Sequence, residues 1–224
     1  MNKSFVHLHA HTEYSMLDGA AKINDYLKKV KELNQPAAAM TDHGNLYGAL
    51  EFVRQAEAQN IKPIIGYEAY VTPGSRFDRP DRDKNKRYHL TLLAENNIGY
   101  QNLVELVSKA YLEGFYYKPR VDYELLREHS EGIIALSGCL GGEVAHTAAD
   151  EGNLAGHAVC NEVAGEVGFG GWLAAGATHA ALALLGSTRP GLRTQALRAL
   201  PSPRKSALVI RKAYRACARA RPRP

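Results

Sequence analysis

The chain alternates short apolar runs with segments in which apolar residues recur every three or four positions. The second pattern is typical of helices with one buried face, and it predicts helices over residues 23–33, 46–60 and 99–111. The apolar runs are bounded by polar residues or glycine, which predicts buried strands. The strands expected on this basis are residues 37–41, 62–71, 88–94 and 132–139.

A further strand is expected at the start of the chain, over Phe5–His11. Here His7, His9 and His11 alternate with Leu8 and Ala10. On a strand, this spacing places all three imidazoles on one face. Because strands and helices alternate along the first part of the chain, we predict an α/β fold of parallel strands with helical crossovers, either a barrel or an open sheet.

Polar residues with ligand chemistry stand near the ends of these expected strands, where α/β folds gather their functional groups. They are His9, His11, Asp42, His43, Glu68, His89 and Cys139. Imidazoles, carboxylates and a thiol from separate strands are typical ligands of divalent metal ions. His89 fits less well, because it begins its strand.

Each residue also has an ordinary interpretation. A lone histidine is more often a surface or core residue than a ligand, and Asp18 before Gly19 could simply form a turn. Cys139 alone would be a buried structural cysteine. Lys118 and Arg120 could contact a phosphate, although surface charge is their more common role.

Composition limits the other functions. The three cysteines are widely spaced, which is not a disulfide framework and fits a reducing compartment. The first residues lack the apolar core of a signal peptide, and no run reaches the roughly 18 apolar residues of a membrane span. A soluble cytoplasmic protein is expected.

The net charge of +5 is unevenly distributed. Residues 1–145 hold 17 Lys and Arg against 19 Asp and Glu, whereas residues 146–224 hold 11 against 4. This last third is rich in Ala, Arg and Gly and loses the strand–helix alternation. We therefore expect a domain over 1–145 and an irregular, poorly ordered basic tail over 146–224, produced by a frameshift or a junction of unrelated sequence near residues 143–146. The alternative is a genuine basic appendage that binds nucleic acid or a partner.

Several motifs carry a resemblance to a known family. They are residues 7–18, Thr41-Asp42-His43-Gly44, Gly66-Tyr67-Glu68, Tyr88-His89-Leu90 and Ser137-Gly138-Cys139-Leu140-Gly141-Gly142. Together they resemble the PHP (polymerase and histidinol phosphatase) domain. Residues 44–52 and 112–122 are similar to the branch found at the N-terminus of bacterial replicative DNA polymerase III alpha subunits. The resemblance runs from about residue 4 to residue 145.

The resemblance implies a distorted (β/α)7 barrel, here partial, that binds up to three divalent ions such as Zn, Mn or Mg. The implied metal ligands are His9, His11, Asp18, His43, Glu68, His89 and Cys139. Two further residues, His7 and Asp42, lie beside ligands and are expected to fix imidazole tautomers by hydrogen bonding. The family also has a late Asp-x-His pair, and the sequence contains none after Cys139.

The activity implied is metal-dependent phosphoester hydrolysis, as a 3′–5′ exonuclease or a pyrophosphatase, within a DNA-directed DNA polymerase whose partners are DNA and other replicase subunits. The polymerase domains of that family exceed what 224 residues can contain. The alternatives are a stand-alone PHP phosphatase, a non-catalytic scaffold and an inactive fragment that does not fold.

Overall fold

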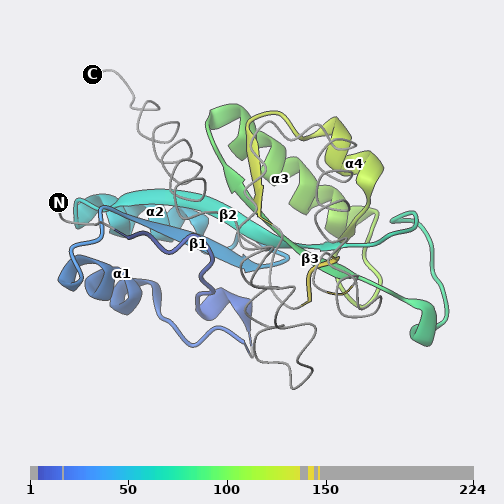
Figure 1. Ribbon diagram of the computed structural model, residues 1–224, viewed down its shortest axis with the longest axis horizontal. Coiled ribbons are helices and arrows are strands. Elements are labelled where there is room, and N and C mark those ends of the chain that lie inside the picture. The colour runs from blue at the N-terminus through green and yellow to red at the C-terminus, as the bar shows by residue number, and fades with distance from the viewer. Residues whose placement is uncertain (1–4, 17, 137–140, 144–145, 147–224) are drawn as a thin grey trace, which may run out of the picture.

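The computed structural model describes residues 5–16, 18–136, 141–143 and 146 (Figure 1). These residues form five strands, four α-helices and two short 3-10 helices, and an α-helix separates each pair of successive strands except the second and third. The strands are β1 (Ala37–His43), β2 (Lys62–Val71), β3 (Tyr88–Ala94), β4 (Arg120–Val121) and β5 (Ile133–Leu136). The α-helices are α1 (Ile23–Glu32), α2 (Ala49–Ala58), α3 (Asn97–Leu112) and α4 (Tyr123–Glu128). The 3-10 helices are η1 (Glu13–Ser15) and η2 (Arg82–Lys84).

The helices form where the apolar spacing predicts them. In α1, Ile23, Leu27 and Val30 recur at helical spacing and are buried, so this face packs into the core. The start of α3 is fixed by Asn96, whose side chain accepts a hydrogen bond from the Gly99 backbone N–H. The short helix α4 begins in the same way.

The strands pair in the order β1–β2–β3–β5, and β4 pairs with β2. The α/β class is confirmed, but the expectation of parallel strands throughout is wrong. β2 is parallel to β1 and β4, whereas β3 runs antiparallel to both β2 and β5. The physical reason is the connection: residues 72–87 join β2 to β3 with η2 but no α-helical crossover, so the chain turns back beside β2.

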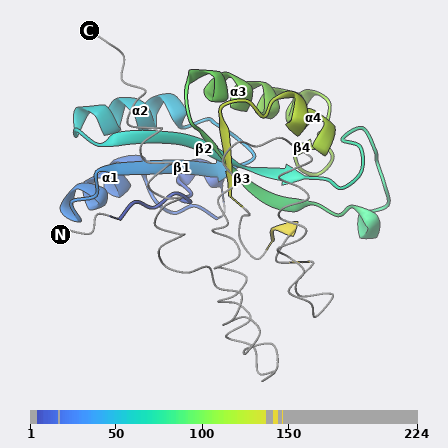
Figure 2. The ribbon, with the colours of Figure 1, turned by 45° about the horizontal axis from the view of Figure 1, so that its top comes forward.

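The two faces of the sheet are covered differently. Figure 2 shows α2, α3 and α4 along one side of the sheet. On that side, buried residues of β2 and β3 pack against α3 and α4, and those of β1 pack against α1 and α2. On the other face, Ala39, Ile64 and Leu93 pack against Val6 and Leu8 of the N-terminal segment. Among the described residues, no α-helix covers this second face (the helix-free face), and the start of the chain packs on it.

The expected strand over Phe5–His11 is absent: no residue of this segment belongs to a strand in the structure. The segment instead crosses the sheet as irregular backbone, with the Thr41 N–H donating to Ala10 O at 2.8 Å. The apolar residues Val6 and Leu8 pack on the sheet, and the histidines His9 and His11 make polar contacts. This division explains the alternating pattern, and it requires no ladder of backbone hydrogen bonds.

Arg120 is fully buried, so surface charge is the wrong interpretation of this residue. Its guanidinium donates to the backbone oxygens of Gly114, Arg76 and Asp78, at 2.7–3.0 Å. Burial, followed by the nearby Arg79, lowers the pKa of Arg120. The side chain thus ties the loop between β2 and β3 to the end of α3.

No helix in the described ranges is long and apolar enough to cross a membrane. Cys139, residues 144–145 of the proposed junction at 143–146, and residues 147–224 of the expected tail over 146–224 lie outside the residues that the structure describes.

Candidate metal centre

The candidate ligands come together because β3 runs opposite to its neighbours. His43 ends β1 and lies directly opposite Glu68 of β2 in the parallel pairing. His89 begins β3 and lies opposite Tyr70 of β2 in the antiparallel pairing. The start of a strand lies beside the carboxyl end of an antiparallel neighbour. His89 begins β3 and therefore lies near the carboxyl end of β2, although the sequence predicted parallel strands, in which the start of a strand would lie away from the site.

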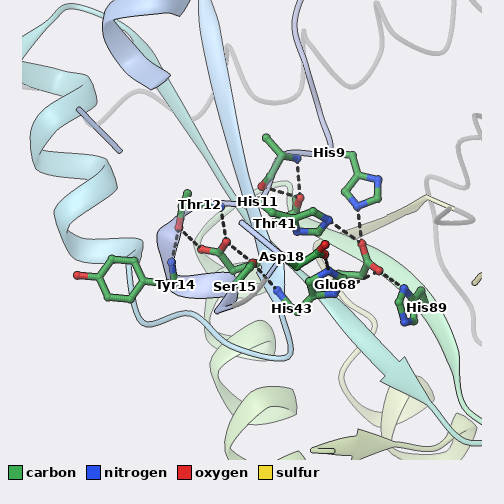
Figure 3. Close-up of polar contacts among 12 residues, drawn as sticks. His9, His11, Thr12, Tyr14, Ser15, Asp18, Thr41, His43, Glu68 and His89 are labelled. Carbon is green, nitrogen blue, oxygen red and sulfur yellow. Dashed lines mark hydrogen bonds and ion pairs between the residues drawn. The ribbon is translucent and has the colours of Figure 1, made fainter. Parts of the chain in front are cut away.

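Glu68 is the centre of the cluster, with its side chain fully buried (Figure 3). One carboxylate oxygen contacts His9 Nε2 and lies 3.4 Å from His11 Nε2. The other contacts His89 Nδ1 and lies 3.5 Å from His43 Nδ1. Four imidazoles from three parts of the chain therefore surround one carboxylate.

Asp18 extends the cluster towards solvent. Its exposed carboxylate contacts Nε2 of His43, and the ring of His43 stacks on that of His11 with centroids 4.1 Å apart. The ligand atoms form three groups, each within 4.8 Å: His9, His11 and Glu68; His11, Asp18 and His43; His43, Glu68 and His89. Shared members join these groups into one continuous set.

Electrostatics suit this cluster to cation binding. Burial alone would raise the pKa of Glu68, but hydrogen bonds from His89 and His9 outweigh it and hold that pKa well below its usual range. Burial, with the neighbouring His43, lowers the pKa of His11. At neutral pH the centre thus offers an ionised carboxylate and a neutral imidazole, the forms that bind metal ions.

The donor set fits divalent ions. Nδ1 of His11 and Nδ1 of His43 are buried and have no hydrogen-bond partner within the described residues. Buried polar atoms are normally satisfied, so such atoms beside ligands point to a missing partner. Mixed imidazole and carboxylate ligands suit Zn and Mn, and the carboxylates also suit Mg.

Six of the seven expected ligands are thus placed together, and the structure leaves Cys139 undescribed. His7 is not brought to the cluster: it is exposed, and its ring lies edge-on to Phe5 with centroids 4.8 Å apart. The strict alternation that predicted His7 beside His9 required a strand, and the segment does not form one.

Asp42 is buried beside the cluster but acts differently from the expectation. Its carboxylate accepts hydrogen bonds from the Thr12 N–H, the Thr12 hydroxyl and the Ser15 hydroxyl, at 2.6–2.7 Å. The Ser15 hydroxyl in turn accepts from the His43 N–H at 3.1 Å. Asp42 therefore holds the loop between His11 and Asp18, and no imidazole is among these hydrogen-bond partners.

Thr12 and Ser15 were missed by the sequence analysis. The available signal was Thr12 immediately before an acidic residue, since Thr12 is the N-cap of η1 and its hydroxyl accepts from the Tyr14 N–H. That signal marks a helix start, and it does not reveal a link to Asp42.

Substitution Asp42→Ala is expected to weaken metal binding by about 10- to 100-fold, because losing an outer hydrogen-bond partner leaves ligands misplaced. The measurement is ion affinity by isothermal titration. Asp25→Ala, on the exposed side of α1, is the matched control and should bind like the parent. Unchanged affinity in Asp42→Ala would show that the loop holds its shape without this carboxylate.

A tight turn follows His43 and shapes one wall of the centre. Gly44 has φ of +66°, and a Cβ there would lie 2.9 Å from Pro119 and 3.1 Å from Tyr70. Glycine is the residue that adopts this backbone at low cost. Its N–H donates to the backbone oxygen of Glu68 at 2.9 Å, so the turn also fixes β1 against β2.

The fold and this carboxylate-centred set of histidines define a class of α/β protein with a candidate site for divalent metal ions. The PHP domain family model matches residues 7–167, about three quarters of the chain, and the chain belongs to this family.

Relatives with high identity are DNA polymerase III alpha subunits. That of Thermus aquaticus is 63% identical over 145 residues, covering 62% of this chain and 12% of the relative. That of Deinococcus radiodurans is 57% identical over 150 residues, covering 63% of this chain and 11% of the relative. The chain thus spans about one eighth of the length of these relatives. A solved candidate metal-dependent phosphoesterase from Bifidobacterium adolescentis is 12% identical, with a TM-score of 0.40, over 61% of this chain and 68% of its own.

Proposed function

We propose that the chain corresponds to the PHP region of a bacterial DNA polymerase III alpha subunit, and that its PHP site hydrolyses phosphodiester bonds with bound divalent ions. The single observation that carries the hydrolytic part is the buried Glu68 carboxylate surrounded by four imidazoles. A buried carboxylate and clustered histidines are costly to a fold unless a cation compensates them.

Each part of the chain has a defined task in this reaction. His9 and His11 come from the N-terminal segment and would hold divalent ions with their imidazoles. Glu68 lies between the imidazoles, and its carboxylate would be a ligand beside them. Ions held by these residues would supply a Lewis acid for the phosphoryl oxygen and would lower the pKa of an attacking water.

The finer activity that we propose is removal of nucleotides from a DNA 3′ end. This rests on the relatives, which are replicative polymerases, and on the exposed Asp18 at the open side of the centre. DNA and the other subunits of the replicase are the corresponding partners. The alternative scaffold role would use the same fold without turnover.

The test is a measurement of metal content and phosphodiesterase activity on the full chain. We expect bound divalent ions, hydrolysis of a 3′-labelled single-stranded DNA, loss of activity with EDTA and recovery with Mn²⁺. His9→Ala should lower the rate by about 100-fold or more, since it removes one ligand of the centre.

The substitution His129→Ala is the control, because the half-buried His129 ring contacts Lys109 and Asn102, which are not members of the candidate metal centre. Bound metal without turnover in the parent chain would favour the scaffold role. A His9→Ala chain that hydrolyses the DNA at the parent rate would show that the activity does not come from this centre.

A further inference from the structure

A cavity of about 420 Å³ opens next to the metal centre. It is lined by residues 85–89 together with Gly141 and His146, and it shares His89 with the candidate ligands. The wall is fixed, because the His89 N–H donates to Gly141 O at 2.9 Å. A Cβ at Gly141 would lie 3.2 Å from the His89 ring, so glycine allows this close approach. The cavity is thus a built extension of the site.

The charge of the cavity is positive. Lys86 and Arg87 line it and are exposed, and its described lining contains no carboxylate. Asn85, also in the lining, is buried, and its side-chain oxygen accepts from the Arg120 guanidinium at 3.3 Å. Two cations with no acid among the described lining residues favour an anionic ligand, and a phosphate is the anion that the neighbouring centre would process.

The cavity also offers aromatic surface. Tyr88 lies edge-on to His146, with ring centroids 5.6 Å apart, and both line the cavity. Stacking on aromatic rings is how proteins bind unpaired bases without regard to sequence. Cations and a ring in one cavity therefore match a nucleotide better than they match a free phosphate.

We propose that this cavity binds the nucleotide next to the scissile phosphate, with Lys86 and Arg87 holding its phosphate and Tyr88 stacking on its base. The proposal rests on the proposed function and adds a binding subsite beside that site, which a single-stranded substrate with at least two phosphates would fill. Arg87 is a positioning residue here, and it does not contact the reacting atoms.

The test is anisotropy of a 5′-fluorescein-labelled deoxythymidine decamer titrated with the full chain, in EDTA so that nothing is cleaved. Arg87→Gln and Lys86→Gln should each weaken binding roughly tenfold, because each loses a charge-assisted contact. Each should also reduce the slope of log affinity against log salt by about 0.7, the value for one phosphate contact on a single strand. Arg54→Gln, an exposed site on α2, is the matched control and should change neither.

Equal weakening by Arg54→Gln, or parent-like binding by Arg87→Gln, would overturn the proposal. Tyr88→Phe should retain the affinity that Tyr88→Ala loses, and equal loss in both would remove the stacking role.

Thymidine monophosphate should displace the decamer at concentrations where inorganic phosphate does not. Displacement by phosphate at equal concentration would reduce the cavity to a general anion site and overturn the nucleotide assignment.

A second substrate separates this proposal from the proposed function. Bis(p-nitrophenyl) phosphate has one phosphate, so its hydrolysis by the parent chain reports on the metal centre, whereas binding of the decamer in EDTA reports on the cavity. If the parent chain fails to hydrolyse it while the Arg87 effect on the decamer persists, the hydrolytic function is wrong and the cavity assignment stands. If the parent chain hydrolyses it and Arg87→Gln binds the decamer as tightly as the parent, the cavity assignment is wrong.

Discussion

Replacing Glu68 by glutamine is expected to abolish binding of divalent ions at the centre. All four imidazoles lie around this one carboxylate, and its oxygens belong to two of the three ligand groups. The substitution keeps the shape but removes the negative charge that balances the cations. We expect ion affinity to fall by at least about 100-fold, more than for an outer partner, measured by metal content after dialysis.

The matched control for this prediction is Glu57→Gln, an exposed carboxylate near the end of α2. It changes the net charge identically and should leave the metal content intact. A Glu68→Gln chain that keeps its full complement of ions would show that the carboxylate is structural and that the histidines bind ions without it.

The largest loss of stability is expected from Asp122→Ala. Asp122 is buried; its carboxylate accepts from the Arg76 guanidinium at 3.1 Å and from the Arg76 N–H at 2.8 Å. It also caps α4 by accepting from the Leu125 N–H at 3.0 Å. Removing it leaves a buried cation with Glu113 as its nearest remaining partner, at 2.6 Å. We expect the free energy of unfolding to fall by about 3 kcal/mol.

The measurement is urea denaturation followed by circular dichroism. Asp122→Asn keeps an acceptor for the helix cap and should lose less. Asp83→Ala, on an exposed 3-10 turn, should stay within about 0.5 kcal/mol of the parent. If Asp122→Ala unfolds at the same urea concentration as the parent, the remaining carboxylates of Glu113 and Glu124 satisfy Arg76.

Much of the secondary structure follows from local pattern. β2 and β3 have the predicted bounds of 62–71 and 88–94, and α1 ends one residue before its predicted end. The two-residue β4 and the six-residue α4 were not predicted, because segments this short contain too few residues to establish a period. The N-terminal segment was predicted wrongly for the opposite reason, since seven alternating residues imitate a strand.

The direction of β3 could not be predicted from its residues. A buried strand has the same apolar composition whether its neighbour runs parallel or antiparallel, and only the connection before it distinguishes the two. The clustering of the six described candidate ligands could nevertheless be predicted, because their residue types and motifs are specific whatever the topology. The sequence does not reveal which residues hold the loop between His11 and Asp18, because Asp42 reaches Thr12 and Ser15 through a fold-dependent contact.

The contacts of the N-terminal segment on the helix-free face limit the order in which the candidate metal centre can assemble during folding. His9 precedes every strand, yet its partner Glu68 lies on the second strand and His89 on the third. A chain emerging from the ribosome cannot assemble these donors until residue 89 has folded back beside β2. Ions bound at that stage would link donors that lie far apart in the first ninety residues. They would stabilise the completed sheet by mass action, and they would not stabilise partly folded states in which the donors are still apart.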